Sequence, residues 1–404
     1  IEATTEEKQK DKEKPKFYRP SRKLSPDGKW KLCVRDHNLF LEPTGDGDEI
    51  QLSKDGKKDH AYKEVFWAPD SNHLVSFRVK PGKISEVHLL ESSPKGGGPA
   101  KLHTRKYPLP GDPFATFELN WFDLSTKRQV KPKVGLIDFR WPRLRWTPDG
   151  QKFHYLKIDR GHQRLRVIEF DTFTGQHRNV INEVSDTFIW TEHPKDLGVP
   201  LVNWLTKSDE IIYLSEKDGW RHLYLIDIPT GKITNPITKG EFVVRYVDHI
   251  DEEKRQVWFR ASGRNPGQDP YLMHYYRVNF DGSGLTPLTE GNGWHKIVYS
   301  PDRKFIIDTY SRVDLPPVHE LRRVRDGKLV CKLEQADVSE LKAEGWEPPE
   351  VFKAKGRDGK TDIWGIVCRP SDFDPKKKYP VLESMYAGPH DSYVPKSFSS
   401  SRRY

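Results

Sequence analysis

Short apolar or aromatic runs alternate with polar turns along most of the chain. One recurring element places a Pro-Asp turn between two such runs. Pro presets φ for the first turn position, Asp closes a turn through its side chain, and a following Gly supplies positive φ. The flanking residues alternate in polarity or are β-branched and aromatic, which predicts the two strands of a hairpin. The element occurs as LSPDGKWKLCV (24–34), FWAPDSNHLVSF (66–77), RWTPDGQKFHYL (145–156) and VYSPDRKFIIDT (298–309).

A second element follows the first at intervals. It consists of an apolar strand, a turn containing Gly, and a strand that ends in Thr or Ser, then Lys or Glu, then Gly. The copies are HLYLIDIPTGKITNPITKGE (222–241), YYRVNFDGSGLTPLTEG (275–291), NLFLEPTGDGDEIQLSKDG (38–56) and, more loosely, RVIEFDTFTGQHRNVINE (166–183).

The spacing of these elements predicts the architecture. The turn prolines Pro26, Pro69, Pro148 and Pro301 recur at intervals of about 40 to 50 residues or multiples of that length. Hairpins repeating at this period are typical of a β-propeller with four strands in each blade. We therefore expect an all-β fold in which residues 21–345 form about seven or eight blades, with eight favoured. A pair of β-sandwiches is the alternative, but it would not explain the recurring turns.

The two ends of the chain depart from this pattern. Residues 1–20 are polar, of mixed charge and Lys-rich, and we expect a disordered leader there. In residues 346–404, VFKAKGRDGKTDIWGIVCRP (351–370) predicts a hairpin and YPVLESMYAG (379–388) predicts a further strand. Because neither blade element recurs in this last part, we expect it to begin another domain.

Composition excludes several classes of protein. The net charge is +9, but no interleaved basic and aromatic signature accompanies it, so we expect no nucleic-acid partner. No apolar run approaches the ~18 residues of a membrane-spanning helix. The three cysteines, Cys33, Cys331 and Cys368, are widely separated, and we expect ordinary thiols rather than disulfides or a zinc site. We expect no cofactor and no metal.

Three separated motifs resemble one family of enzymes. LSEKDGWRHLYLIDIPTGKITNPITKGEFVV (214–244) and DTYSRVDLPPVHELRRVRDGKLVCKLEQAD (308–337) resemble the propeller of the dipeptidyl peptidase IV branch of the prolyl oligopeptidase (S9) serine peptidase family. FDPKKKYPVLESMYAGP (373–389) is similar to the entry of that family into its α/β-hydrolase catalytic domain. The resemblance runs from about residue 20 to the end of the chain.

The resemblance implies a substrate-gating propeller joined to the first strands of an α/β-hydrolase. It implies a parent enzyme that hydrolyses peptide bonds after Pro or Ala near a peptide N-terminus with a Ser-His-Asp triad. It also implies that Tyr386 donates a hydrogen bond in the oxyanion hole, a role suited to a donor held on a turn. No G-x-S-x-G sequence occurs in the chain, so we expect the nucleophile and the remaining catalytic domain beyond Tyr404.

The expected amine-binding site departs from the family pattern. The branch carries a Glu-Glu pair that binds the free amino terminus of the substrate. The matching stretch here, residues 53–70, holds the single Glu64, and Glu192 is a further lone candidate. The pair Glu252-Glu253 lies in a polar hairpin turn, where we expect solvated side chains. Release of dipeptides, release of tripeptides, and cleavage of longer or blocked peptides therefore all stay open.

Arg221 and His222, beside a blade strand, are expected to make structural hydrogen bonds rather than catalyse. The resemblance implies a periplasmic or secreted protein, with a cytoplasmic one as the alternative, and a homodimer as a candidate assembly. The functional alternative is a non-catalytic propeller that serves as an interaction scaffold, in which case the parent protein would lack the nucleophile.

Overall fold

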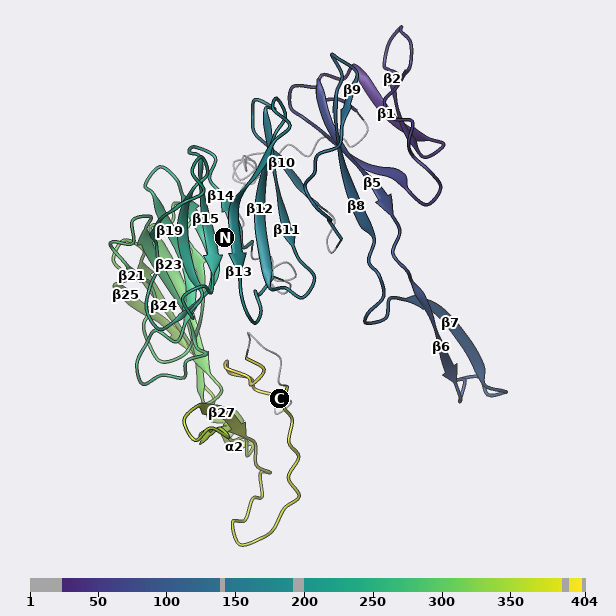
Figure 1. The fold of residues 1–404 in the computed structure, drawn as a ribbon. Helices are drawn as coiled ribbons and strands as arrows, with labels where there is room; N and C mark the ends of the chain where they lie inside the picture. The colour runs from purple at the N-terminus through teal and green to yellow at the C-terminus, as the bar shows by residue number, and fades with distance from the viewer. Residues whose placement is uncertain (1–23, 139–141, 192–199, 387–391, 402–404) are drawn as a thin grey trace. The chain divides into compact units, whose positions relative to one another are not determined.

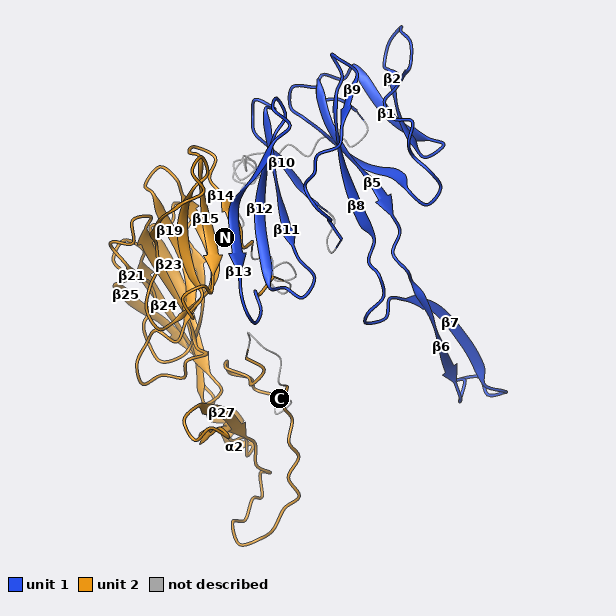
Figure 2. Ribbon diagram, in the orientation of Figure 1, with its two compact units in different colours: residues 1–189 blue, residues 190–404 orange. Residues whose placement is uncertain are grey.

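The computed structural model of the chain describes residues 24–138, 142–191, 200–386 and 392–401. It divides into two compact units, residues 1–189 and 190–404, which Figure 2 colours separately. Each unit is described by itself below. The predicted leader, residues 1–20, lies outside the described residues.

The first unit consists of antiparallel sheets made from consecutive hairpins (Figure 1). Its described strands form one three-stranded sheet, two four-stranded sheets and a separate two-stranded ribbon, β6-β7. The ribbon interrupts the second sheet, whose order is β4-β5-β8-β9. The strands are β1 (Trp30–Arg35), β2 (Asn38–Pro43), β3 (Ile50–Gln51), β4 (Ala61–Trp67), β5 (His73–Lys80), β6 (Ser85–Glu91), β7 (Lys101–Tyr107), β8 (Thr116–Asp123), β9 (Arg128–Val130), β10 (Leu144–Trp146), β11 (Lys152–Ile158), β12 (Arg164–Asp171) and β13 (His177–Val184).

The second unit repeats the same architecture. Its described strands form three four-stranded sheets in simple consecutive order, followed by a short helix and the hairpin β26-β27. The elements are β14 (Val202–Trp204), β15 (Glu210–Ser215), β16 (His222–Asp227), β17 (Ile233–Pro236), β18 (Val243–Asp251), β19 (Gln256–Ser262), β20 (Met273–Asn279), β21 (Thr286–Pro287), β22 (Trp294–Tyr299), β23 (Phe305–Arg312), β24 (Leu315–Arg323), β25 (Leu329–Gln335), α2 (Ser339–Ala343), β26 (Glu350–Lys355) and β27 (Asp362–Val367).

The predicted Pro-Asp turns are confirmed, and a hydroxyl group closes three of the four; the other has Ala68 at this position. The Ser25 hydroxyl donates to Asp27 at 2.6 Å and accepts the Trp30 amide at 3.0 Å, so one side chain fixes both ends of the turn. Thr147 and Ser300 do the same in their own turns. Gly28 adopts φ 74°, the left-handed conformation that the turn requires.

The second predicted element is also confirmed, and the hydroxyl of its closing Thr or Ser accepts a hydrogen bond from a backbone amide. Thr238 Oγ1 accepts the Leu223 amide at 3.0 Å and lies 3.0 Å from His222 Nδ1. Thr289 accepts the Tyr275 amide at 3.1 Å, and Ser53 accepts the Leu39 amide at 2.9 Å. The hydroxyl therefore satisfies a buried amide at the start of a strand, where an apolar residue would leave it unpaired.

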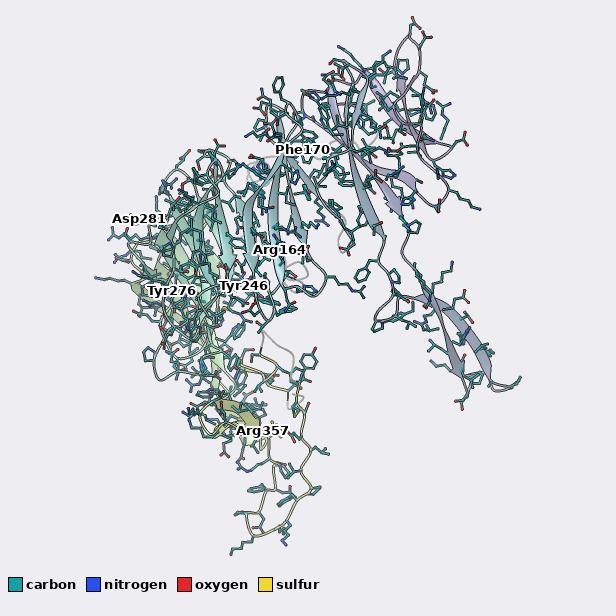
Figure 3. The ribbon with its side chains drawn as sticks, in the orientation of Figure 1. Arg164, Phe170, Tyr246, Tyr276, Asp281 and Arg357 are labelled. Carbon is teal, nitrogen blue, oxygen red and sulfur yellow. The ribbon has the colours of Figure 1, made fainter. Side chains whose placement is uncertain are left out.

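Apolar side chains fill the space between adjacent sheets of each unit. In the first unit, Phe77 of β5, Trp121 of β8 and Phe153 of β11 belong to one buried cluster. Phe170, labelled in Figure 3, stacks on Phe153 with ring centroids 4.8 Å apart. In the second unit, Trp258 of β19 and Ile306 of β23 share another cluster. Each sheet thus buries its face against a neighbour, as propeller blades do.

The predicted fold class, an all-β propeller, is confirmed. Six sheets of three or four strands are blades among the described residues. The expected total of seven or eight blades stays a prediction. The last described blade ends at Gln335, and the hairpin predicted for residues 351–370 is present as β26-β27. A domain boundary near residue 345 stays a prediction as well. Within the described part of the chain, no helix has the length and apolarity to span a membrane.

The strand predicted for residues 379–388 is wrong for the part that the structure describes. Residues 379–386 have no regular secondary structure. Val381 and Leu382 are 88% and 96% exposed, which is the opposite of the burial that their apolar character suggests. A strand needs a hydrogen-bonding partner, and no described strand pairs with this segment.

Candidate active site

Tyr386, the predicted oxyanion donor, lies at the end of the exposed segment 379–386. Its side chain is 70% exposed, and its ring lies 5.7 Å from that of Tyr393. The phenol is therefore accessible and is not a core side chain. The structure brings no described serine, histidine and aspartate together around it, so the role predicted for Tyr386 stays a prediction.

Glu64, a predicted amine-binding residue, occupies an irregular point of β4. The register of β4 on β5 shifts between Lys63 and Val65, and Glu64 adopts φ 52° at this bulge. Such a conformation costs free energy for a residue with a Cβ, and strained residues of this kind cluster at functional sites. Its carbonyl accepts the Ser76 hydroxyl at 2.9 Å, which holds the bulge in place. Its side chain is half-buried.

The other predicted site residues lie in other parts of the chain. Glu192 lies outside the described residues. Glu64 belongs to the first unit and Tyr386 to the second. Of the two residues that we expected to be solvated, Glu253 has a side chain that is 77% exposed and pairs with Lys207 at 2.5 Å. Glu252 is half-buried and accepts the Thr206 amide at 2.8 Å.

The segment after Tyr386 is anchored to the last blades by a buried ion pair that the sequence did not reveal. Lys396 Nζ lies 2.6 Å from the carboxylate of Asp269, and both side chains are about nine-tenths buried. The Phe398 amide donates to the Ser311 hydroxyl at 3.1 Å, and the Phe398 ring contacts Trp346. These contacts border a cavity of about 200 Å³ beside β27. Residues 396–398 are therefore held against the blades of their own unit.

A network of buried charges lies inside the last described blade. The side chains of His295 and Asp308 are fully buried and lie 2.8 Å apart. Arg322 binds Glu320 through two nitrogens at 2.7 and 2.9 Å, Glu290 at 3.0 Å and a backbone carbonyl at 3.0 Å. Burial raises the pKa of the Asp308 carboxyl, while the hydrogen bond from His295 opposes that rise. Because every charge has a partner, we interpret this network as structural.

Arg221 and His222 follow the prediction only in part. His222 makes structural hydrogen bonds, with Nδ1 3.0 Å from Thr238 and Nε2 2.8 Å from the Gly240 carbonyl. Arg221 is only 2% exposed, yet its terminal guanidinium nitrogens make no hydrogen bond among the described residues. Sequence reasoning missed this difference, because both residues flank the same buried strand.

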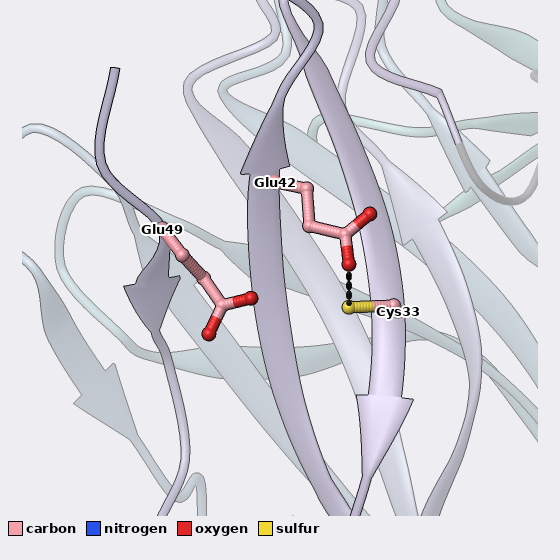
Figure 4. Close-up of side chains that lie close together, drawn as sticks. All are labelled: Cys33, Glu42 and Glu49. Carbon is pink, nitrogen blue, oxygen red and sulfur yellow. Dashed lines mark hydrogen bonds between the residues drawn. The ribbon is translucent and has the colours of Figure 1, made fainter.

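Cys33, Glu42 and Glu49 lie close together on the first sheet (Figure 4). The Cys33 thiol donates to Glu42 at 3.3 Å, and burial raises the pKa of this thiol. Lys31 already pairs with Glu42, and Arg35 pairs with Glu49. A protonated thiol and two neutralised carboxylates form an ion-paired surface, so we assign no metal to it. Cys331 and Cys368 are exposed.

Comparison with known sequences assigns this architecture to one family. A family profile described as the dipeptidyl peptidase IV N-terminal region matches residues 3–317. A probable dipeptidyl-aminopeptidase B of Aspergillus fumigatus is 25% identical over 431 residues, which cover 93% of this chain and 45% of that protein. The dipeptidyl-aminopeptidase B of Aspergillus niger is 26% identical over 421 residues, with the same coverage. The chain thus spans less than half the length of these relatives.

Solved structures show the same fold. The dipeptidyl peptidase 4 of Porphyromonas gingivalis aligns with 93% of this chain and 54% of its own, at a TM-score of 0.65 and 20% identity. A putative dipeptidyl aminopeptidase IV from Bacteroides ovatus aligns with 93% of this chain and 55% of its own, at a TM-score of 0.60 and 19% identity.

Proposed function

The chain belongs to the dipeptidyl peptidase IV family, and from that premise we propose that it is the substrate-gating propeller of a serine exopeptidase. The observation that carries the proposal is the match to the N-terminal region of that family over residues 3–317. The parent enzyme hydrolyses peptide bonds after Pro or Ala near the N-terminus of a peptide. Its catalytic domain begins within residues 346–404 and continues beyond Tyr404, where the nucleophile lies.

The exposed segment 379–386 supports this division of the molecule. Val381, Leu382 and Met385 are 70 to 96% exposed, although apolar side chains gain free energy from burial. Nearby, Lys396 and Phe398 fix the chain to the last blades. An exposed apolar segment beside an anchored stretch is what we expect where a buried strand of the catalytic sheet lacks its partner strands, which we place outside this chain.

Activity tests the proposal directly. We expect the full-length protein to hydrolyse chromogenic peptides with Pro or Ala before the scissile bond, and to be labelled at serine by a fluorophosphonate. Absence of both hydrolysis and labelling would contradict the peptidase and favour the non-catalytic interaction scaffold.

Within this function, Tyr386 donates its phenol hydrogen to the oxyanion of the tetrahedral intermediate. Replacing Tyr386 by Phe removes one donor to that charge, so kcat should fall by about 10²-fold or more. The neighbouring Tyr393→Phe variant is the matched control, because its ring lies 5.7 Å away and has no assigned role. Equal kcat values for the Tyr386→Phe enzyme and the wild type would contradict the oxyanion role of Tyr386.

Glu64 and Glu192 are the carboxylates proposed to bind the amino terminus of the substrate. The strained backbone and half-buried side chain of Glu64 support this role for it. We expect Glu64→Gln and Glu192→Gln to raise KM for peptides with a free amino terminus and to leave N-acetylated peptides unaffected. Equal rates on free and acetylated peptides in the wild type would instead indicate a substrate class other than free dipeptides.

We further propose that the protein is exported to the periplasm or secreted, which cell fractionation tests.

We also propose that the protein forms a homodimer through the ribbon β6-β7. All seven residues of β7 are exposed, and Leu90 lies opposite Leu102 with both 66% exposed. An isolated two-stranded ribbon is marginal in water, so its apolar face suits a contact between copies. The molar mass measured by light scattering should be that of a dimer for the wild type and that of a monomer for the Leu102→Glu variant.

A further inference from the structure

Arg221 stands at the start of β16, at the end of the turn that joins β15 to β16. Its carbonyl accepts the Val244 amide at 2.9 Å, which ties the residue to the neighbouring blade of the same unit. The residue is 2% exposed, and both terminal guanidinium nitrogens are buried without a hydrogen-bond partner in the described ranges. An unpaired buried charge of this kind costs several kcal/mol, so a structural role alone does not explain it.

The other deeply buried arginine of the same unit shows what a structural guanidinium looks like. Arg322 is 4% exposed, and it binds Glu320, Glu290 and the Gly327 carbonyl with four hydrogen bonds of 2.7 to 3.0 Å. Both arginines are secluded from water, but within the described residues only Arg322 has its donors satisfied. The terminal donors of Arg221 are therefore available to a ligand.

The surroundings of Arg221 orient it without using those donors. Its guanidinium lies over the ring of Trp190 at 4.3 Å from the centroid. A cation over an aromatic ring is attracted to the ring face, and this contact does not use up its N–H donors. Two terminal nitrogens without a partner among the described residues match the two oxygens of a carboxylate.

The local charges also favour an anion. Burial lowers the pKa of Arg221 to about 10, which leaves it protonated at neutral pH. Among the described residues, the charge of Glu216 raises the pKa of Arg221 and the charge of Arg245 lowers it. Burial raises the pKa of Glu216, which disfavours the ionised form of this carboxyl. Glu216 is therefore a weak competitor for the guanidinium of Arg221.

We propose that Arg221 binds a carboxylate of a peptide ligand through its two terminal nitrogens, and that this contact makes the protein select peptides with an acidic group. The peptide nature of the ligand rests on the proposed function, whereas the carboxylate rests on the geometry of Arg221 alone. The carboxylate comes from the C-terminus of a short peptide or from an acidic side chain near its N-terminus.

Matched peptides test the proposal on the full-length protein. One peptide ends in a free carboxylate, the second is its C-terminal amide, and the third is the amide with Asp in place of Asn after the cleaved bond. We expect the wild type to prefer a carboxylate-bearing peptide by about 10- to 100-fold in KM, the range for a charged hydrogen bond. The first peptide reports a terminal carboxylate, and the third reports a side-chain carboxylate.

Arg221→Met should raise KM for the preferred acid to that of the amide without changing kcat for the amide. Arg221→Lys keeps the charge but not the two-pronged geometry, and it should retain a weaker preference. Arg322→Met is the matched control: it should lower stability and leave the acid-to-amide ratio unchanged. A ratio of one in the wild type, or a ratio that survives in Arg221→Met, would overturn the proposal.

Calorimetric binding of the same acid and amide separates this proposal from the peptidase proposal. If the protein hydrolyses neither peptide but binds the acid more tightly and loses this preference in Arg221→Lys, the carboxylate site stands and the peptidase falls. If it hydrolyses both with equal KM and binds both equally, the peptidase stands and the site falls. If Arg221→Met fails to fold, the acid-to-amide preference of Arg221→Lys tests the proposal in its place.

Discussion

The blades and the segment 379–386 have similar apolar patterns but opposite structures. In β16, Leu223, Leu225 and other apolar residues are almost completely buried between paired strands. In residues 379–386, Val381 and Leu382 are exposed and no strand forms. A blade finds its hydrogen-bonding partners within a few tens of residues, across short hairpin turns. The segment has no such neighbour in the described chain, so its apolar residues have nothing to pack against.

The difference shows when an apolar pattern in the sequence is sufficient to predict a strand. In a hairpin, the partner strand, the turn and the closing hydroxyl all lie close together in the sequence, so the local sequence pattern predicts it. A strand of a parallel sheet depends on partners that lie far away in the sequence. The apolar run at residues 380–386 therefore marks a strand only in the presence of those partners, which we place in the catalytic domain.

The largest effect that separates the two regions is the loss of a buried ring from a blade. Phe153 is fully buried and contacts Phe170 at 4.8 Å and Trp146 at 5.0 Å between ring centroids. Phe153→Ala should lower the free energy of unfolding by about 4 kcal/mol through lost contacts and a cavity. Leu382→Ala, at a side chain that is 96% exposed, should change it by less than about 0.5 kcal/mol in this 404-residue chain.

Urea unfolding of both variants measures this contrast. In the full-length protein, Leu382→Ala should become costly, at about 2 kcal/mol or more, because the catalytic domain would then bury Leu382. If Leu382→Ala remains neutral there, the segment does not become a buried strand and the comparison fails.

A smaller effect comes from pH, which acts on buried blade residues and not on the exposed segment. Burial, and secondarily the charge of His295, lowers the pKa of His274 to about 3. The unfolded chain takes up a proton at this residue below its ordinary pKa of about 6.5, whereas the folded chain does not until about pH 3. The contribution of His274 to stability is thus complete above pH 6.5 and is lost progressively as the pH falls toward 3.

Unfolding midpoints measured between pH 7 and pH 5 test this dependence. By pH 5 the loss at His274 amounts to about 2 kcal/mol. His274→Gln should remove that part of the pH dependence, while His88→Gln, at an exposed ribbon position, should leave the slope unchanged. Equal slopes in the wild type and in His274→Gln would show that His274 is not buried in its neutral form.

Much of the fold was predictable from sequence, and the reason is again locality. The Pro-Asp turns and the closing hydroxyls join residues that are close in the chain, such as Ser25 with Asp27. The site was less predictable. Lys396 and Asp269 are 127 positions apart, and no local pattern links them. The terminal nitrogens of Arg221 have no partner within the described residues, and a sequence does not report which neighbours a side chain lacks in three dimensions.

The smallest effect on stability that we predict comes from a single turn residue of a blade. Gly28 closes a Pro-Asp turn at φ 74°, and a Cβ added there would meet no atom within 4 Å. Gly28→Ala should therefore cost about 1 kcal/mol through backbone conformation alone. Gly45 is the matched control, because its Cβ would also meet nothing within 4 Å but no positive φ is required there. Gly45→Ala should stay within about 0.5 kcal/mol of the wild type or stabilise the chain slightly. Equal unfolding midpoints for the two alanine variants would show that the left-handed turn, which the blade pattern in the sequence predicts, contributes nothing to the stability of the blades.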